Sequence, residues 1–114
     1  MTSLTRELLL ALKPEVQKFE VEHLGTVYIK PLTELARSRR MTEAYGKDGK
    51  LCQEYKQKMR AKMIVDQLCD EEGACLFTDA DLNDVLNLDG SKLDKLCDAI
   101  HDFNERHEKK DPGE

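Results

Sequence analysis

Three side chains with oxygen ligands stand at alternate positions, Asp79, Asp81 and Asn83, as in the first half of a calcium-binding loop. The Ca²⁺ ion prefers carboxylate and amide oxygens, so these residue types suit it. The pattern fails further on, because Asp84 stands where the loop requires glycine and Gly90 stands where a bidentate glutamate should close the site. Acidic residues here are also typical of the first turn of a helix, where the helix dipole favours negative charge. We therefore expect a helix N-terminus and no metal site.

The remaining reactive side chains do not form the nucleophile and base of a catalytic site. His101 follows Cys97 by one helical turn, but Cys97 falls on the apolar face of its expected helix. The sequence has no glycine-rich phosphate loop and no His-Glu-x-x-His motif. We expect a protein that is not an enzyme and needs no cofactor. Its cysteines form no Cys-x-x-Cys pair and are interpreted as small buried hydrophobes in a reduced cytoplasm: Cys52, Cys69, Cys75 and Cys97.

Charged residues are unevenly distributed along this acidic chain, whose net charge is −5. Residues 37–62 contain nine basic and three acidic residues, whereas residues 66–114 contain five basic and fifteen acidic ones. The two segments are interpreted as solvated surfaces of opposite sign, with attraction within the fold or between copies as the alternative. Nucleic-acid binding is not expected, since the basic segment lacks interleaved aromatic residues. Such binding would depend on five basic residues: Arg37, Arg39, Arg40, Lys47 and Lys50.

The N-terminal part of the chain changes from a helical to a strand pattern. A short helix is expected from a cap at Ser3 to about residue 13, where Pro14 blocks its continuation. Its leucines are too few to span a membrane. They predict docking on the body of the protein, with binding to a partner as the alternative. Alternating apolar residues then predict a β-hairpin with strands over residues 16–22 and 26–30.

Helical patterns fill the rest of the chain. The expected caps are Thr33, Thr78 and Ser91, and Gly73 is expected to end the longest helix. Between these helices, Leu76-Phe77 is expected to pack on the core.

The sequence thus predicts an α+β, mainly helical fold, with an N-terminal β-hairpin packed on a bundle of about four to five helices. One globular domain is expected over residues 1–107, followed by a disordered charged tail over residues 108–114. The expected helices after the hairpin cover residues 34–45, 51–72, 78–88 and 91–107.

The longest expected helix carries apolar residues on two sides. One side includes Ala61, Ile64, Val65 and Leu68, and nearly opposite lies a second side with two methionines. Such a helix is either central in the fold or shared between the core and a partner. Methionine is flexible and suits an adaptable contact. The candidate partner-binding residues are therefore Tyr55, Met59 and Met63, together with the basic residues Arg37, Arg39 and Arg40.

Two segments carry a resemblance to a known family. Residues 27–33 read Val-Tyr-Ile-Lys-Pro-Leu-Thr, and residues 73–82 read Gly-Ala-Cys-Leu-Phe-Thr-Asp-Ala-Asp-Leu. In this order of hairpin and helices, the chain resembles the small tail assembly chaperones of long-tailed, siphovirus-like bacteriophages. The resemblance covers residues 16–103.

This resemblance implies a protein without catalytic activity that acts in several copies in the cytoplasm of the host cell. Its implied partners are the tape measure protein, which it keeps soluble, and the tail tube protein, to which the tape measure is delivered. The chaperone would be absent from the mature virion. The other class of function considered is a small nucleic-acid-associated or regulatory adaptor that uses the basic segment 37–62.

Overall fold

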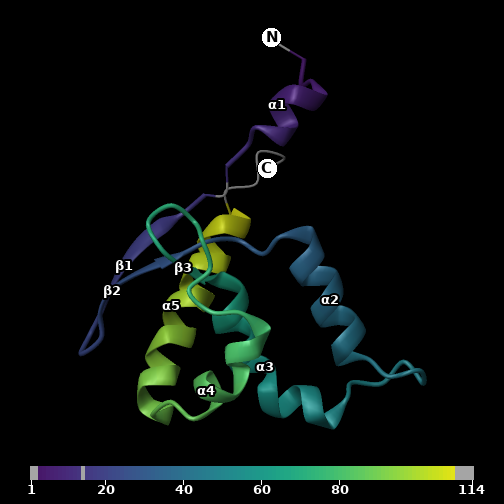
Figure 1. The fold of residues 1–114 in the computed structure, drawn as a ribbon, viewed down its shortest axis with the longest axis vertical. Helices are drawn as coiled ribbons and strands as arrows, with labels where there is room; N and C mark the ends of the chain where they lie inside the picture. Colours follow the sequence, from purple (N-terminus) through teal and green to yellow (C-terminus); the bar gives the residue numbers. More distant parts are fainter. Residues whose placement is uncertain (1–2, 14, 110–114) are drawn as a thin grey trace.

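The computed structural model describes residues 3–13 and 15–109 of the 114-residue chain. It confirms a mainly helical α+β fold, in which helices pack on one small antiparallel sheet of strand order β1-β2-β3 (Figure 1). No helix among the described residues is long and apolar enough to cross a membrane. The elements are α1 (Arg6–Leu10), β1 (Gln17–Val21), β2 (Gly25–Ile29), α2 (Glu34–Ala44), α3 (Gln53–Gln67), β3 (Leu68–Cys69), the 3₁₀ helix η1 (Asp79–Asp81), α4 (Leu82–Leu86) and α5 (Gly90–Lys109).

The predicted hairpin is present, and its strands pair antiparallel with Phe19 opposite Val27. A third strand was not predicted. The helix expected to continue to residue 72 ends at Gln67, where the backbone turns to an extended conformation. Leu68 then pairs with Ile29 of β2. The prediction was wrong because hydrogen bonding to the free edge of β2 outweighs the local helical pattern. Gly73, with φ of 91°, lies in the turn after β3 rather than at a helix end.

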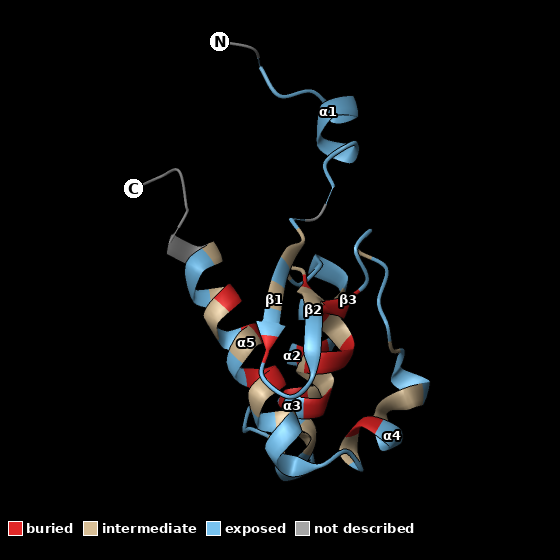
Figure 2. Ribbon diagram, turned by 90° about the vertical axis from the view of Figure 1, so that its left-hand side faces the viewer, coloured by how far each residue is buried: buried red, intermediate tan, exposed pale blue. Residues whose placement is uncertain are grey.

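The core lies where α3 and α5 pack against the sheet (Figure 2). The α3 side with Ala61 and Ile64 is buried there, so α3 is the central helix, as expected. Phe103 of α5 is fully buried, and its ring meets the Phe19 ring edge-on at 6.4 Å between centroids. Phe77 also packs against this core, whereas Leu76 is exposed. The expectation that Leu76 and Phe77 both pack on the core is therefore confirmed for Phe77 and wrong for Leu76.

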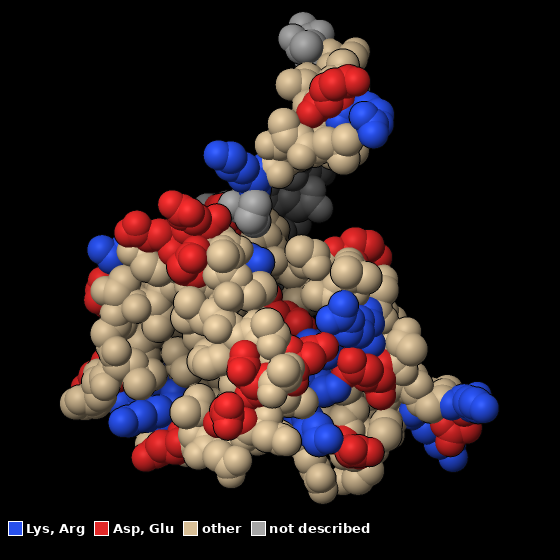
Figure 3. Space-filling model, in the orientation of Figure 1, with Lys and Arg blue, Asp and Glu red and all other residues tan. Residues whose placement is uncertain are grey.

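Helix α1 differs from its prediction in length, cap and position. Its cap is Thr5, whose Oγ1 accepts a hydrogen bond from the Leu8 amide at 3.1 Å, and not Ser3. The helix extends away from the body (Figure 1), and its surface is mostly uncharged (Figure 3). The prediction that it docks on the body was wrong, because α5 already packs against β1 and covers the apolar face of the hairpin. Between 48% and 67% of each leucine of this segment is exposed: Leu4, Leu8, Leu9, Leu10 and Leu12.

Two of the other predicted caps are correct and one is not. The Thr33 hydroxyl accepts the Ala36 amide at the start of α2, and Thr78 forms a capping box with Asp81. Ser91 lies inside α5, and its amide donates to the Asp89 carboxylate at 2.8 Å. The side chain of Asp89, two residues before Ser91, thus takes the capping role that was expected of the serine. Helix α5 runs to Lys109, beyond residue 107, and residues 110–114 of the expected tail lie outside the described residues.

Candidate partner-binding site

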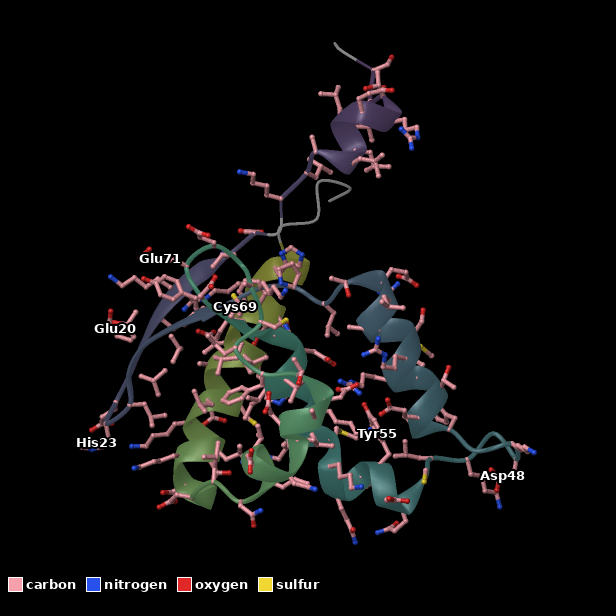
Figure 4. All side chains as sticks on the ribbon, viewed as in Figure 1. Glu20, His23, Asp48, Tyr55, Cys69 and Glu71 are labelled. Carbon is pink, nitrogen blue, oxygen red and sulfur yellow. The ribbon has the colours of Figure 1, made fainter. Side chains whose placement is uncertain are left out.

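The second side of α3 faces a cavity of about 200 Å³, here called the methionine cavity. Tyr55 lies in the space between α2 and α3 (Figure 4). The predicted site residues Tyr55, Met59 and Met63 are thus brought together, with Arg40 beside them. The cavity walls come from α2, α3, α5 and the segment between β2 and α2. The lining residues are Leu32, Arg40, Tyr55, Met59, Met63, Asp66, Gln67 and Asn104.

Exposure falls from Met59 to Met63 along this side of α3. Met59 is 42% exposed, whereas Met63 is half-buried and packs against the core. The Tyr55 ring is also half-buried, with the Lys62 ammonium 5.2 Å from its centre, and burial is the main cause that raises the pKa of its hydroxyl. One side of α3 is therefore part of the core, as expected of a central helix, and its other side is a half-open apolar surface.

A hydrogen-bonded amide pair, Gln67 and Asn104, lines the methionine cavity. Gln67 is 1% exposed, and its Nε2 donates to the Asn104 Oδ1 at 2.7 Å and to the Lys30 carbonyl oxygen at 3.1 Å. The Asn104 Nδ2 donates back to the Gln67 Oε1 at 3.3 Å. These bonds connect α3, α5 and the segment after β2, so the cavity is built on ordered elements rather than on a loop. No local sequence pattern indicates this pair, since the two residues lie 37 positions apart.

Helix α2 is mostly exposed, but its candidate partner-binding residue Arg40 points into the protein with 8% exposure. Its guanidinium donates to both Asp66 carboxylate oxygens at 2.7 Å and to the Asp79 Oδ1 at 2.7 Å. A third acid, Glu43, accepts from Arg40 Nη1 at 3.0 Å. A buried charge needs such complete pairing. The hydrogen bonds to Asp66, ahead of those to Asp79, raise the pKa of Arg40. We call these four residues the arginine cluster.

The arginine cluster fastens α2 to the body. Only Arg40 and Ala44 of α2 are buried, and cavities flank the helix on both sides. One is the methionine cavity, and the other, of about 470 Å³, lies between α2 and the segment around Phe77. Since apolar packing under α2 is sparse, its position depends largely on ion pairs. Sequence reasoning missed Asp66, although an acid beside Ile64 and Val65 on the buried side of a helix is a usable signal.

Asp79 contributes to this cluster in a pH-dependent way. The hydrogen bond from Arg40 is the main cause that lowers the pKa of the Asp79 carboxyl from its usual 3.8. A carboxyl with a lowered pKa in the folded protein adds stability at neutral pH, and this stability is lost as the pH falls through the folded-state value. We expect the difference in unfolding free energy between wild type and Asp79→Asn to stay constant down to about pH 5 and to shrink below it. Urea unfolding over a pH series measures this, and a pH-independent difference would contradict it.

The other two candidate arginines do not join the methionine cavity. Arg37 is exposed and lies 3.2 Å from Glu34 on its own helix, whereas Arg39 contacts the Asp79 carboxylate at 3.2 Å. The six candidate residues therefore divide into a cavity set of Tyr55, Met59, Met63 and Arg40, and two separate surface arginines. Asp79, considered above as a calcium ligand, forms ion pairs with Arg39 and Arg40. Among the described residues, no group of three potential metal ligands occurs.

Comparison with known proteins decides the family. A family model described as "Phage tail assembly chaperone, TAC" matches residues 4–104. The chain belongs to the phage tail assembly chaperone family. A similar solved structure is that of the bacteriophage HK97 tail assembly chaperone, with a TM-score of 0.62 and 17% identity over 84% of this chain and 94% of that one. At this identity the likeness shows the fold. Among curated proteins, none matches the chain significantly.

The basic segment of this family member is largely neutralised within the fold. Besides Arg39 and Arg40, the structure pairs Lys58 with Glu54 at 3.1 Å, and it also pairs Arg60 with Asp94 and Lys62 with Glu43. These pairs reduce the positive charge that the segment presents to a phosphate backbone. The geometry therefore gives no support to the adaptor alternative based on residues 37–62.

The four cysteines do not share one environment. Cys69 and Cys97 are buried, as predicted, and burial is the main cause that raises the pKa of both thiols. Cys52 is half-buried, whereas Cys75 is exposed. The expectation of a buried residue was therefore wrong for Cys75, which lies after the turn that follows β3.

Proposed function

We propose that this member of the tail assembly chaperone family binds the tape measure protein through the methionine cavity, keeps it soluble and promotes assembly of the tail tube. The role is non-enzymatic and belongs to the cytoplasm of the host cell, and the protein leaves before the virion is mature. The observation that carries the proposal is the half-open, methionine-lined side of α3 in a chain of this family.

The size and lining of the cavity suit the side chains of an apolar helix. Ligand pockets for small molecules span roughly 300–1,000 Å³, and the methionine cavity, at about 200 Å³, is smaller. It therefore fits one or two anchoring side chains of an amphipathic helix better than a small molecule. Flexible methionine side chains adapt to different apolar partners, which favours a client that presents many similar helices.

The test is a charge placed at the exposed end of the cavity. Met59→Lys is expected to weaken binding of a purified tape-measure fragment by about tenfold or more, because a lysine in an apolar contact must lose its hydration. Since Met59 is 42% exposed, circular dichroism and thermal unfolding should stay close to wild type. Calorimetry and co-expression solubility of the tape measure are the measurements.

A matched control is available in Leu88, which is 43% exposed near the end of α4 and does not line the cavity. Leu88→Lys introduces the same charge at a similar exposure and should leave binding unchanged. Unchanged binding by Met59→Lys, or equal losses in both variants, would refute the cavity as the client site. Met63 is less suitable for this test because it packs against the core.

Two further contacts belong to the proposal. We propose that copies of the chain associate with one another through surfaces of opposite charge, and that the complex with the tape measure meets the tail tube protein. The five exposed leucines around α1 support a contact with another molecule, since a helix of five residues has little stability alone.

A further inference from the structure

Cys69 of β3 and Cys75 lie directly opposite each other in a short antiparallel ladder. Backbone hydrogen bonds from amide to carbonyl flank the pair on both sides. Their donors and acceptors are Asp70 and Ala74, at 2.9 Å, and Leu76 and Leu68, at 3.2 Å. Since these bonds join the neighbours of the two cysteines, the cysteines form a non-hydrogen-bonded pair, in which facing side chains come closest.

The spacing of such a pair suits a disulfide bond. Facing Cα atoms of a non-hydrogen-bonded pair lie about 4.5 Å apart, and disulfides join Cα atoms that are roughly 4.4–6.8 Å apart. Side chains that face each other across a ladder also project to the same side of the sheet. The other two cysteines do not belong to this ladder, because Cys52 precedes α3 and Cys97 lies within α5.

The turn between the two cysteines is held in place by its own contacts, with Cys69 at its foot (Figure 4). The Asp70 carboxylate accepts hydrogen bonds from the amides of Glu72 at 2.8 Å and Ala74 at 3.0 Å. From β2, the Tyr28 hydroxyl donates to a carboxylate of the turn at 3.3 Å. An ordered turn keeps the two thiols near each other, so their reaction resembles a well-oriented intramolecular one.

The two thiols differ in their access to solvent. Cys75 is exposed and lines the cavity of about 470 Å³ beside α2, whereas Cys69 is 1% exposed. The Cys69 thiol donates only a weak hydrogen bond, to the Tyr28 carbonyl oxygen at 3.5 Å. A reagent in solution therefore meets Cys75 first, and Cys69 is placed to react with the product.

We propose that Cys69 and Cys75 form a reversible disulfide, with a low-molecular-weight disulfide such as oxidised glutathione as the oxidant. The Cys75 thiolate attacks one sulfur of the reagent, one small thiol leaves, and a mixed disulfide remains on Cys75. The Cys69 thiolate then attacks the Cys75 sulfur, and the second small thiol leaves. In total the two cysteines lose two protons and two electrons, which the reagent takes up as it becomes two thiols.

The bond would act on the segment that carries Phe77. This ring packs against the core and lines the cavity beside α2, two residues after Cys75. A disulfide closes the turn after β3 and ties this segment to the sheet, and because one of its sulfurs is accessible it stays reducible. The modification goes beyond the proposed function and does not depend on it, since the methionine cavity contains neither cysteine.

Equilibration of the full chain in buffers of reduced and oxidised glutathione at a series of ratios tests the proposal. The reaction is quenched, the remaining thiols are alkylated, and the chain is digested with trypsin. Cleavage after Lys62 and Lys92 leaves both cysteines in one peptide, residues 63–92, whereas Cys52 and Cys97 fall in other peptides. Mass spectrometry should find this peptide lighter by two hydrogen atoms and without alkyl groups.

The same titration in urea gives the reference for the unfolded chain. The equilibrium constant for forming the bond should be about tenfold or more larger in the folded chain, because the ladder already holds the two thiols together. Equal constants in the two states would overturn the proposal. So would a folded wild type whose peptide 63–92 keeps two free thiols, or a bond from Cys75 to any other cysteine.

Two variants test the order of the steps. Cys69→Ala should stop the reaction at the first step, so that peptide 63–92 gains one glutathionyl group on Cys75. Cys52→Ala is the matched control and should form the bond like wild type. A Cys69→Ala chain that circular dichroism shows to be folded, but that gains no glutathionyl group, would overturn the assignment of Cys75 as the attacking thiol. The wild-type titration needs no variant.

Discussion

Replacing Asp66 by alanine is expected to lower the free energy of unfolding by about 3–5 kcal/mol, because the buried Arg40 guanidinium loses its main partner. The carboxylate accepts two hydrogen bonds of 2.7 Å from Arg40, and both side chains are under 10% exposed. Asp79 and Glu43 remain, but they are more exposed and cannot replace the lost pair. Urea unfolding followed by circular dichroism measures the loss.

Two variants control this prediction. Arg37→Ala removes an exposed ion pair on the same helix and should cost less than about 1 kcal/mol. The double variant Arg40→Met/Asp66→Leu removes both buried charges and should be more stable than Asp66→Ala, since no unpaired charge stays buried. A loss for Asp66→Ala no larger than that for Arg37→Ala would contradict the structural role of the arginine cluster.

The second large effect is expected in the core. Phe103→Ala should lower the free energy of unfolding by about 3–5 kcal/mol, because it leaves a cavity between α5, β1 and α3. The Phe103 ring is fully buried, meets Phe19 edge-on and stacks on the His107 ring at 5.6 Å. Phe103→Leu retains most of the volume and should cost clearly less. Equal losses for the two variants, measured by urea unfolding, would contradict a tightly packed site.

The two substitutions should differ in where they loosen the protein. Helix α2 rests on the arginine cluster between two cavities, so Asp66→Ala should speed amide hydrogen exchange in α2 before it affects α5. Phe103→Ala removes packing shared by α5 and the sheet, so exchange should rise in both. This difference matters for the proposed function, because α2 forms one wall of the methionine cavity.

Local patterns in the sequence were sufficient for much of the fold. The alternation around Phe19 and Val27 predicted the hairpin, and the Thr33 and Thr78 caps were found from residue types within one turn. The two apolar sides of α3 were also visible from spacing, and so was the grouping of Tyr55, Met59 and Met63 on one side. These features depend on neighbours within about four positions, where the period of a helix or strand dictates which side chains share a face.

Tertiary structure decided the features whose partners lie far along the chain. Arg40 pairs with Asp66 and Asp79, which lie 26 and 39 residues further along the chain. A local sequence pattern contains no information about contacts at such separations. The end of α3 at Gln67 depends on a free edge of β2. The exposure of α1 depends on α5 having already covered the hairpin. The sequence by itself thus determined the hairpin, most of the helices and the family. Only the packing of distant charges and strand edges decided where α3 ends, that β3 forms and which surfaces remain exposed.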